Sequence, residues 1–207
     1  MTIDKAYDSW ADNYDSVENK TRDLERIAAK QILDKYNYTN VIELGCGTGK
    51  NTEWLLDKAN SIIGLDFSPA MLLKAKEKIK SNKVQFQQAD LAKPWIIKDN
   101  YADLISCSLT LEHISDLNFI FREGYKKLKS KGKFFICELH PFKQYKGTKA
   151  KFEYGNKIVE LEVFTHHVSE YINAAINNGF RVLELKEWFD NDDNSNIPRL
   201  ISFVFEK

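Results

Sequence analysis

The stretch VIELGCGTGK, residues 41–50, decides how this sequence folds. A short, mostly apolar run at residues 41–44 leads into a loop with glycine at every second position from Gly45 to Gly49. Glycine allows a sharp turn and a close approach to a ligand, because no Cβ stands in the way. Ligands of open parallel sheets bind outside the carboxyl ends of the strands, so we expect this loop to lie at a binding site.

Strand-like and helical patterns alternate on both sides of this loop. The patterns predict strands at residues 61–66, 84–89, 102–108, 133–139, 182–188 and 200–205, and helices that begin near residues 23, 50, 69, 117 and 169. Repeated strand–helix units imply a doubly wound α/β fold, with a mostly parallel sheet and helices on both faces. The polar run at residues 191–196 is too short for a crossover helix. The last strand should therefore run antiparallel to the one before it.

The composition indicates one globular domain, residues 1–207, and argues against several classes of protein. Hydrophobic residues make up 43% of the chain, too many for a disordered protein. Lysine and arginine total 30, as do aspartate and glutamate, so we expect no nucleic acid as a partner. The three cysteines lack metal-ligand spacing, and we expect no metal. We see neither a signal peptide nor an apolar stretch of roughly 20 residues, so we expect a cytoplasmic protein without a membrane span.

Two acidic residues mark the ends of further strands. Asp66 ends the second strand, where a carboxylate can accept hydrogen bonds from the hydroxyl groups of a ribose. Asp90 follows the third strand and is placed to accept from an exocyclic amine such as that of adenine. Each also has a structural interpretation, Asp66 as a helix cap and Asp90 as a turn former. Because both acids and the glycine loop fall at successive strand ends, together they indicate a nucleoside-containing ligand.

These segments resemble the class I S-adenosylmethionine-dependent methyltransferases. The matching segments are VIELGCGTGKNTEWL, IIGLDFSPAML, VQFQQADL, ADLISCSLTLEH and LKSKGKFFICELHPF, which span about residues 40–140. The resemblance implies a Rossmann-like sheet of seven strands, with the last antiparallel, and S-adenosyl-L-methionine as cofactor. It also implies a set of cofactor-binding residues. They are Glu43, Gly45, Cys46, Gly47 and Gly49 at the methionine part, Asp66 at the ribose, Phe67, Met71 and Asp90 at the adenine, and in addition Leu91 and Ser106.

A dinucleotide-binding oxidoreductase is the alternative that shares a glycine loop. Its G-x-G-x-x-G fingerprint, counted from Gly45, requires a third glycine where Lys50 stands. A pyrophosphate on the helix N-terminus needs the close approach that this glycine permits. The dinucleotide interpretation is therefore disfavoured.

The N-terminal segment, residues 1–22, is predicted to be a lid. It carries the aromatic residues Tyr7, Trp10 and Tyr14, and in related enzymes such a segment folds over the cofactor. Aromatic faces attract a sulfonium as they attract quaternary ammonium groups. Arg22 is a candidate partner for the cofactor's carboxylate. The alternative is that these aromatics simply pack onto the edge of the sheet.

The acceptor is predicted to be a small molecule that is methylated at oxygen or nitrogen, with residues 141–168 as a substrate-side insertion. Residues 106–111 lack the Pro-Pro-aromatic motif of enzymes that methylate adenine or glutamine. The candidate catalytic residues are His140, His113 in a Leu-Glu-His element, and His167, each with a structural alternative. Gly155 and Asn156 predict a hairpin turn. A protein or RNA methyltransferase subunit, or a domain that binds the cofactor without transferring its methyl group, stays open. The sequence does not predict the oligomeric state.

Overall fold

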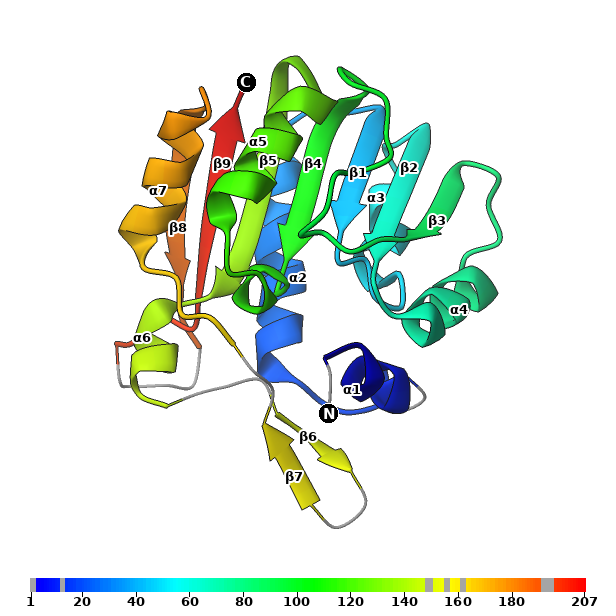
Figure 1. Cartoon of the computed structure of the whole chain (residues 1–207), viewed down its shortest axis with the longest axis vertical. Helices are drawn as coiled ribbons and strands as arrows, with labels where there is room; N and C mark the ends of the chain where they lie inside the picture. Colours follow the sequence, from blue (N-terminus) through cyan, green and yellow to red (C-terminus); the bar gives the residue numbers. More distant parts are fainter. Residues whose placement is uncertain (1–2, 12–13, 148–150, 155–156, 161–162, 191–195) are drawn as a thin grey trace.

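The computed structural model describes residues 3–11, 14–147, 151–154, 157–160, 163–190 and 196–207. Within these residues a seven-stranded sheet has the order β3-β2-β1-β4-β5-β9-β8. Its strands are β1 (Asn40–Leu44), β2 (Ser61–Asp66), β3 (Val84–Gln88), β4 (Ala102–Ser108), β5 (Leu128–Leu139), β8 (Arg181–Trp188) and β9 (Leu200–Glu206). Strands β1 to β5 run parallel to one another. Strand β9 is antiparallel to both β5 and β8, which confirms the predicted fold class (Figure 1).

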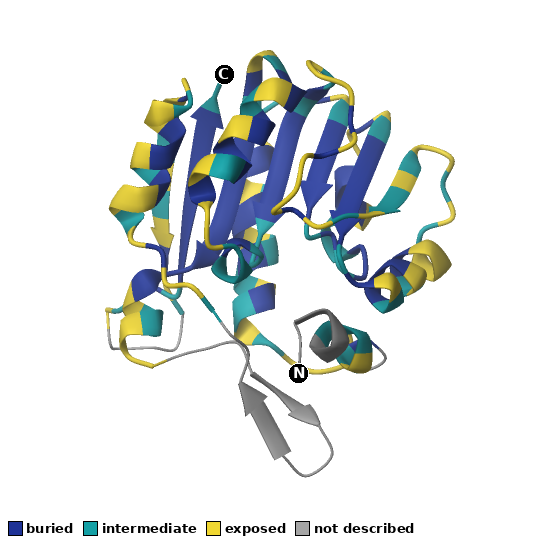
Figure 2. Ribbon diagram, in the orientation of Figure 1, coloured by how far each residue is buried: buried dark blue, intermediate teal, exposed yellow. Residues whose placement is uncertain are grey.

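Helices cover both faces of the sheet, and a hydrophobic core lies under each. One core joins β-strand residues to α2 (Lys20–Leu33) and α3 (Lys50–Leu55), and the other joins them to α5 (Leu117–Lys127) and α7 (Val168–Asn177). Along β1, for example, Val41 belongs to the first core and Ile42 to the second. Figure 2 shows the central strands buried between these layers. Burial on both faces explains why the parallel strands are continuous apolar runs.

The remaining elements gather at the carboxyl ends of the parallel strands, in the lower part of Figure 1. Helix α1 (Ile3–Trp10) lies beside α4 (Pro69–Lys78), and α6 (Pro141–Tyr145) follows β5. Strands β6 (Lys151–Tyr154) and β7 (Lys157–Glu160) pair antiparallel as the predicted hairpin. Its predicted turn residues, Gly155 and Asn156, lie outside the described residues.

Several elements differ from the sequence-based expectation, among them α1, which lies before the first predicted helix. Strand β5 begins at Leu128 rather than at residue 133, because the chain becomes extended as soon as α5 ends and Leu128 pairs with Ala102. Helix α6 was not expected in the basic stretch after β5. The side chain of His140 caps it and Pro141 occupies its first turn, a combination that favours a helix start.

None of the described helices is long and apolar enough to cross a membrane. Within the same part of the chain, no three His, Cys, Asp or Glu side chains cluster in a way that would hold a metal ion.

Candidate functional site

The glycine loop between β1 and α3 is held in a left-handed conformation. Gly45, Gly47 and Gly49 have φ angles of 66°, 51° and 77°. A Cβ on Gly45 would lie 2.1 Å from Oγ1 of Thr110, so the loop after β4 packs directly against this glycine. A Cβ on Gly47 would meet nothing within 4 Å. Gly45 is therefore required for packing, whereas Gly47 leaves open space in front of the loop.

Asp66, at the end of β2, fixes the position of this loop. Its Oδ2 accepts a hydrogen bond from the backbone N–H of Gly47 at 2.8 Å, and its Oδ1 accepts one from Ser68 at 2.9 Å. The residue is 5% exposed. Burial raises the pKa of this carboxyl, while the backbone N–H groups oppose the rise. Asp66 thus lies at the predicted cofactor edge, directly behind the glycine loop.

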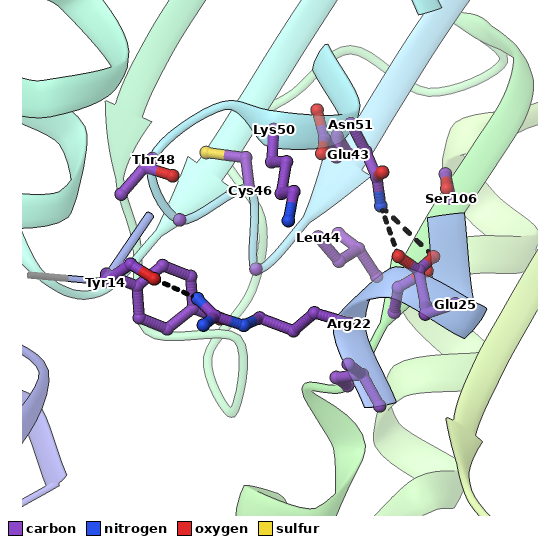
Figure 3. Close-up of a pocket in the computed structure, with 14 residues that line it drawn as sticks. Tyr14, Arg22, Glu25, Glu43, Leu44, Cys46, Thr48, Lys50, Asn51 and Ser106 are labelled. Carbon is purple, nitrogen blue, oxygen red and sulfur yellow. Dashed lines mark hydrogen bonds between the residues drawn. The ribbon is translucent and has the colours of Figure 1, made fainter. Parts of the chain in front are cut away.

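A small pocket of about 60 Å³ lies between the loop and α2 (Figure 3). Its lining includes many of the predicted cofactor residues, namely Tyr14, Arg22, Glu43, Gly45, Cys46, Gly47 and Ser106. It also includes residues that sequence reasoning missed, among them Glu25, Thr48, Asn51 and Ser108. Pockets for drug-sized ligands hold roughly 300–1,000 Å³. The pocket is smaller, and two side chains of the N-terminal segment, those of Tyr14 and Arg22, line it.

Arg22 is one of two cationic side chains that line this pocket in the described residues, the other being Lys50. Its guanidinium carbon lies 4.2 Å from the centre of the Tyr14 ring, and its N–H groups donate to the backbone oxygens of Tyr14 and Val17. The side chain is buried, and its Nε atom has no hydrogen-bond partner among the described residues. A buried guanidinium nitrogen without a partner is unfavourable, so an anionic group entering the pocket would stabilise it.

Two buried carboxyl groups face the same pocket. Glu43, near the end of β1, accepts a hydrogen bond from Oγ1 of Thr52, and burial raises its pKa to about 8. Glu25, on α2, accepts from Nδ2 of Asn51 at 3.1 Å, and burial raises its pKa as well. The sequence signal for Glu25 was its position three residues after Arg22, on the buried face of an amphipathic helix. A cation in the pocket would favour the charged form of both acids.

The other predicted cofactor residues do not line this pocket. Gly49 caps α3, and Met71 and Leu91 are buried. Phe67 packs edge-on against Tyr7, with ring centres 5.7 Å apart. Asp90 is exposed, accepts from the N–H of Ala92 and pairs with Lys93, so the structure shows it as a turn former.

The predicted lid crosses the carboxyl edge of the sheet and is bonded to it at several points. Asp8 accepts from Oγ of Ser68 at 2.6 Å and from the N–H of Ala70 at 3.2 Å, at the start of α4. Asp15 accepts from Oγ1 of Thr48 at 2.8 Å and pairs with Lys78. The segment therefore passes over the glycine loop and the end of β2.

The three predicted catalytic histidines occupy different settings. His113 forms a hydrogen bond of 2.9 Å through Nε2 with the hydroxyl of Tyr7. His140 is buried, its Nδ1 accepts from the N–H of Phe142, and its Nε2 lies 3.1 Å from a carboxylate oxygen of Glu187. Burial lowers the pKa of His140, although Glu187 opposes this.

His167 is exposed and precedes α7, with its backbone N–H donating to Glu170. Its ring pairs with the hydroxyl of Tyr145. His140 and His167 thus stand at helix starts, which matches their structural alternative. A catalytic role for any of the three stays a prediction.

Known proteins match this chain in sequence and in fold. Residues 42–136 match a family model described as a methyltransferase domain. Over 135 residues the chain is 30% identical to a malonyl-[acyl-carrier protein] O-methyltransferase of Bacillus cytotoxicus, covering 63% of this chain and 47% of the relative. Over 101 residues it is 32% identical to a ubiquinone biosynthesis O-methyltransferase of Pelagibacter ubique, covering 48% and 42%. The chain spans about half the length of these curated relatives.

A crystal structure of an S-adenosylmethionine-dependent methyltransferase from Mesorhizobium loti has the same fold. It superposes with a TM-score of 0.76 at 20% identity, covering 89% of this chain and 98% of the other. The glycine loop, the strand order and the matches in sequence and fold agree with one another. Together they show that the chain has the fold of S-adenosylmethionine-dependent methyltransferases and that residues 42–136 match a methyltransferase domain.

Proposed function

We propose that this chain binds S-adenosyl-L-methionine and transfers its methyl group to an oxygen or nitrogen of a small-molecule acceptor. The observation that carries the proposal is the open space in front of Gly47, with Arg22 and Glu43 lining the same pocket. Residues 1–22 would act as the lid, and residues 141–168 would shape the acceptor side. The names of the relatives, which are O-methyltransferases, support methyl transfer as the reaction class.

The charges in the pocket fit the cofactor's methionine part. That part has an ammonium group, a carboxylate and a sulfonium. Glu43 and Glu25 would hold the cationic groups, since both are buried carboxyls in the pocket wall. Arg22 would exchange its contacts with Tyr14 and Val17 for the carboxylate.

The ribose would bond to Asp66. This carboxylate already accepts one N–H on each oxygen and retains lone pairs for hydroxyl donors. Ribose binding would therefore add to the contacts that hold the glycine loop.

When bound, S-adenosylmethionine supplies a methyl group on a sulfonium that an acceptor's lone pair can displace. The contribution of the chain is to align the acceptor and to exclude water. Helix α1 and the aromatic residues Tyr7 and Tyr14 would cover the reacting groups. A base is needed only where the acceptor must lose a proton.

The test compares two glycines by calorimetry with S-adenosylhomocysteine. Gly47 and Gly147 both have positive φ, and a Cβ on either meets nothing within 4 Å in the described residues, so an alanine strains the backbone at each position without a steric clash there. Gly47→Ala should weaken binding by about tenfold or more, because the methyl group occupies ligand space. Gly147→Ala should bind like the unchanged protein. Absence of binding to the unchanged protein, or tight binding of a nicotinamide dinucleotide, would contradict the proposal.

A further inference from the structure

The acceptor side of the site contains a buried carboxyl group that the proposed function does not use. Glu138, near the end of β5, is 2% exposed. Its Oε1 accepts hydrogen bonds of 3.0 Å from the backbone N–H groups of Thr110 and Leu111. Its Oε2 is buried without a hydrogen-bond partner in the described part of the chain. One oxygen thus holds the loop after β4, and the other is available to a ligand.

A second carboxyl group, that of Glu112, lies next to it. Glu112 is in the single turn that follows β4, and it contributes to raising the pKa of Glu138, which burial brings to about 8. Burial also raises the pKa of Glu112 to about 7, and its carboxylate accepts from Nε2 of Gln144 at 3.3 Å. Among the described residues, no lysine or arginine forms an ion pair with either carboxyl group. Within the described residues, the two acids therefore have no cationic ion-pair partner.

Exposed aromatic residues lie on the segments that contact Glu112. Phe142 and Tyr145, each 53% exposed, lie on α6 on either side of Gln144, with ring centres 6.0 Å apart. Phe164 is also exposed, and its backbone N–H donates to the backbone oxygen of Glu112 at 2.7 Å. Large exposed aromatic side chains that gather at one place indicate a contact surface for a ligand or a partner. Figure 1 shows α6 at the same edge of the sheet as the glycine loop.

We infer that Glu112, Glu138 and the aromatic rim of Phe142, Tyr145 and Phe164 form the acceptor subsite, and that the acceptor is an amine with an apolar body. This inference rests on the proposed function. An ammonium group is attracted both by aromatic faces and by carboxylates that lack a cation. A carboxylate acceptor would instead place a third negative charge beside two acids, which disfavours it. The inferred acceptor thus differs from the malonyl group in the name of the Bacillus relative.

The carboxylates would also accept the proton that an ammonium acceptor must lose before it can be methylated. The ammonium gives one proton to the carboxylate of Glu112 or Glu138 and becomes a neutral amine. The nitrogen lone pair then forms the bond to the methyl carbon as the bond from that carbon to sulfur breaks. The products are the methylated amine in its ammonium form, S-adenosylhomocysteine and the protonated carboxyl group, so the positive charge moves from sulfur to nitrogen and atoms and charges balance.

The test measures binding of three probes that share a phenyl body: 2-phenylethylamine, 3-phenylpropionate and 2-phenylethanol. Each probe is titrated by calorimetry into the complex of the protein with S-adenosylhomocysteine. The titration is done at pH 8.5, which is above the pKa values of about 7 and about 8 to which burial raises Glu112 and Glu138. The amine should bind about tenfold or more tightly than either other probe, since hydrogen bonds to charged groups are the stronger kind.

Three variants test whether the preference for the amine probe depends on the carboxyl groups of Glu112 and Glu138. Glu112→Gln and Glu138→Gln should each reduce the preference for the amine by about tenfold, while the amide oxygen at position 138 can still accept from Thr110 and Leu111. Glu123→Gln is the matched control. Glu123 is also buried, but it lies on α5 and accepts from the N–H of Trp95 and from Lys126. This variant should keep the preference, and thermal melting of all three reports whether they fold.

Three outcomes would overturn the inference: equal or tighter binding of the carboxylate or the alcohol, an unchanged preference in both Glu112→Gln and Glu138→Gln, or binding of none of the probes. If Glu138→Gln does not fold, Glu112→Gln decides alone, because its side chain is only partly buried. Failure of S-adenosylhomocysteine itself to bind would count against the proposed function instead. The two failures are therefore distinguishable.

Discussion

Two aspartates at opposite edges of the sheet allow a stringent test of the cofactor site. Asp66 accepts from the N–H groups of Gly47 and Ser68 at the carboxyl edge. Asp103, on β4 at the amino edge, accepts from the N–H groups of Thr39 and Asn40 at 3.2 and 2.9 Å. Each carboxylate thus holds two backbone N–H groups, but only Asp66 lies beside the proposed ribose position. We compare Asp66→Ala with Asp103→Ala.

The expected effects on stability follow from the pKa shifts. Although desolvation acts to raise it, hydrogen bonds from Lys129 and Thr39 lower the pKa of Asp103 from 3.8 to about 2. This difference of about 1.8 units corresponds to about 2.4 kcal/mol at neutral pH. Since the side chain is 26% exposed, we expect Asp103→Ala to cost about 1–2 kcal/mol. A lowered folded pKa means that this stability is present above pH 3.8 and is lost as the pH falls through about 2.

Asp66 differs from Asp103, because the cost of burying its charge outweighs the effect of its hydrogen bonds on its pKa. Burial raises the pKa of Asp66, so its ionised form does not add to folding stability in the same way. Removal of the Asp66 carboxylate leaves the backbone N–H groups of Gly47 and Ser68 without an acceptor, but it also removes a buried charge. We expect Asp66→Ala to lower the free energy of unfolding by about 1–2 kcal/mol. The lost ribose bonds should weaken cofactor binding by about 2–3 kcal/mol, or about 30- to 150-fold.

The assay combines urea unfolding with calorimetric titration of S-adenosylhomocysteine for both variants. Asp66→Ala should lose stability and affinity, and Asp103→Ala should lose stability alone. Unchanged affinity in Asp66→Ala would refute the assignment of Asp66 to the ribose. Equal losses of affinity in both variants would mean that affinity follows folding stability rather than a local contact.

Further predictions concern Glu43, the lid and His140. Because burial raises the pKa of Glu43 to about 8, we expect its carboxyl group to be protonated at pH 7 and to release this proton when an ammonium group binds beside it. Calorimetry in buffers of different ionisation enthalpy should detect the released proton, and Glu43→Gln should abolish the release. The first fifteen or so residues should be cut by protease without ligand and protected by S-adenosylhomocysteine, whereas equal cleavage in both states would reduce the segment to ordinary packing. His140→Ala should lower the urea unfolding free energy by about 1 kcal/mol and His140→Asn should restore it, because asparagine is a good helix cap; no difference between the two variants would argue against the capping role.

The sequence alone was sufficient to predict the sheet and its ligand-binding edge. Alternating strand and helix patterns predicted the parallel strands, and the short polar run before Leu200 predicted the antiparallel last strand. The glycine loop and Asp66 were likewise recognisable. These features are determined locally, since periodicity, turn residues and connection length are properties of neighbouring positions in the chain.

Contacts between distant elements were decided only in the tertiary structure. Glu25 reaches the pocket because α2 packs on the sheet beside the glycine loop, and its helical position after Arg22 does not by itself show which elements it meets. Asp90 fits the family pattern, yet its side chain closes its own turn. The unpartnered oxygen of Glu138 likewise depends on a loop almost thirty residues earlier. Local patterns determine where strands and helices form, but close packing in three dimensions determines which buried side chains meet and which polar atoms lack a partner.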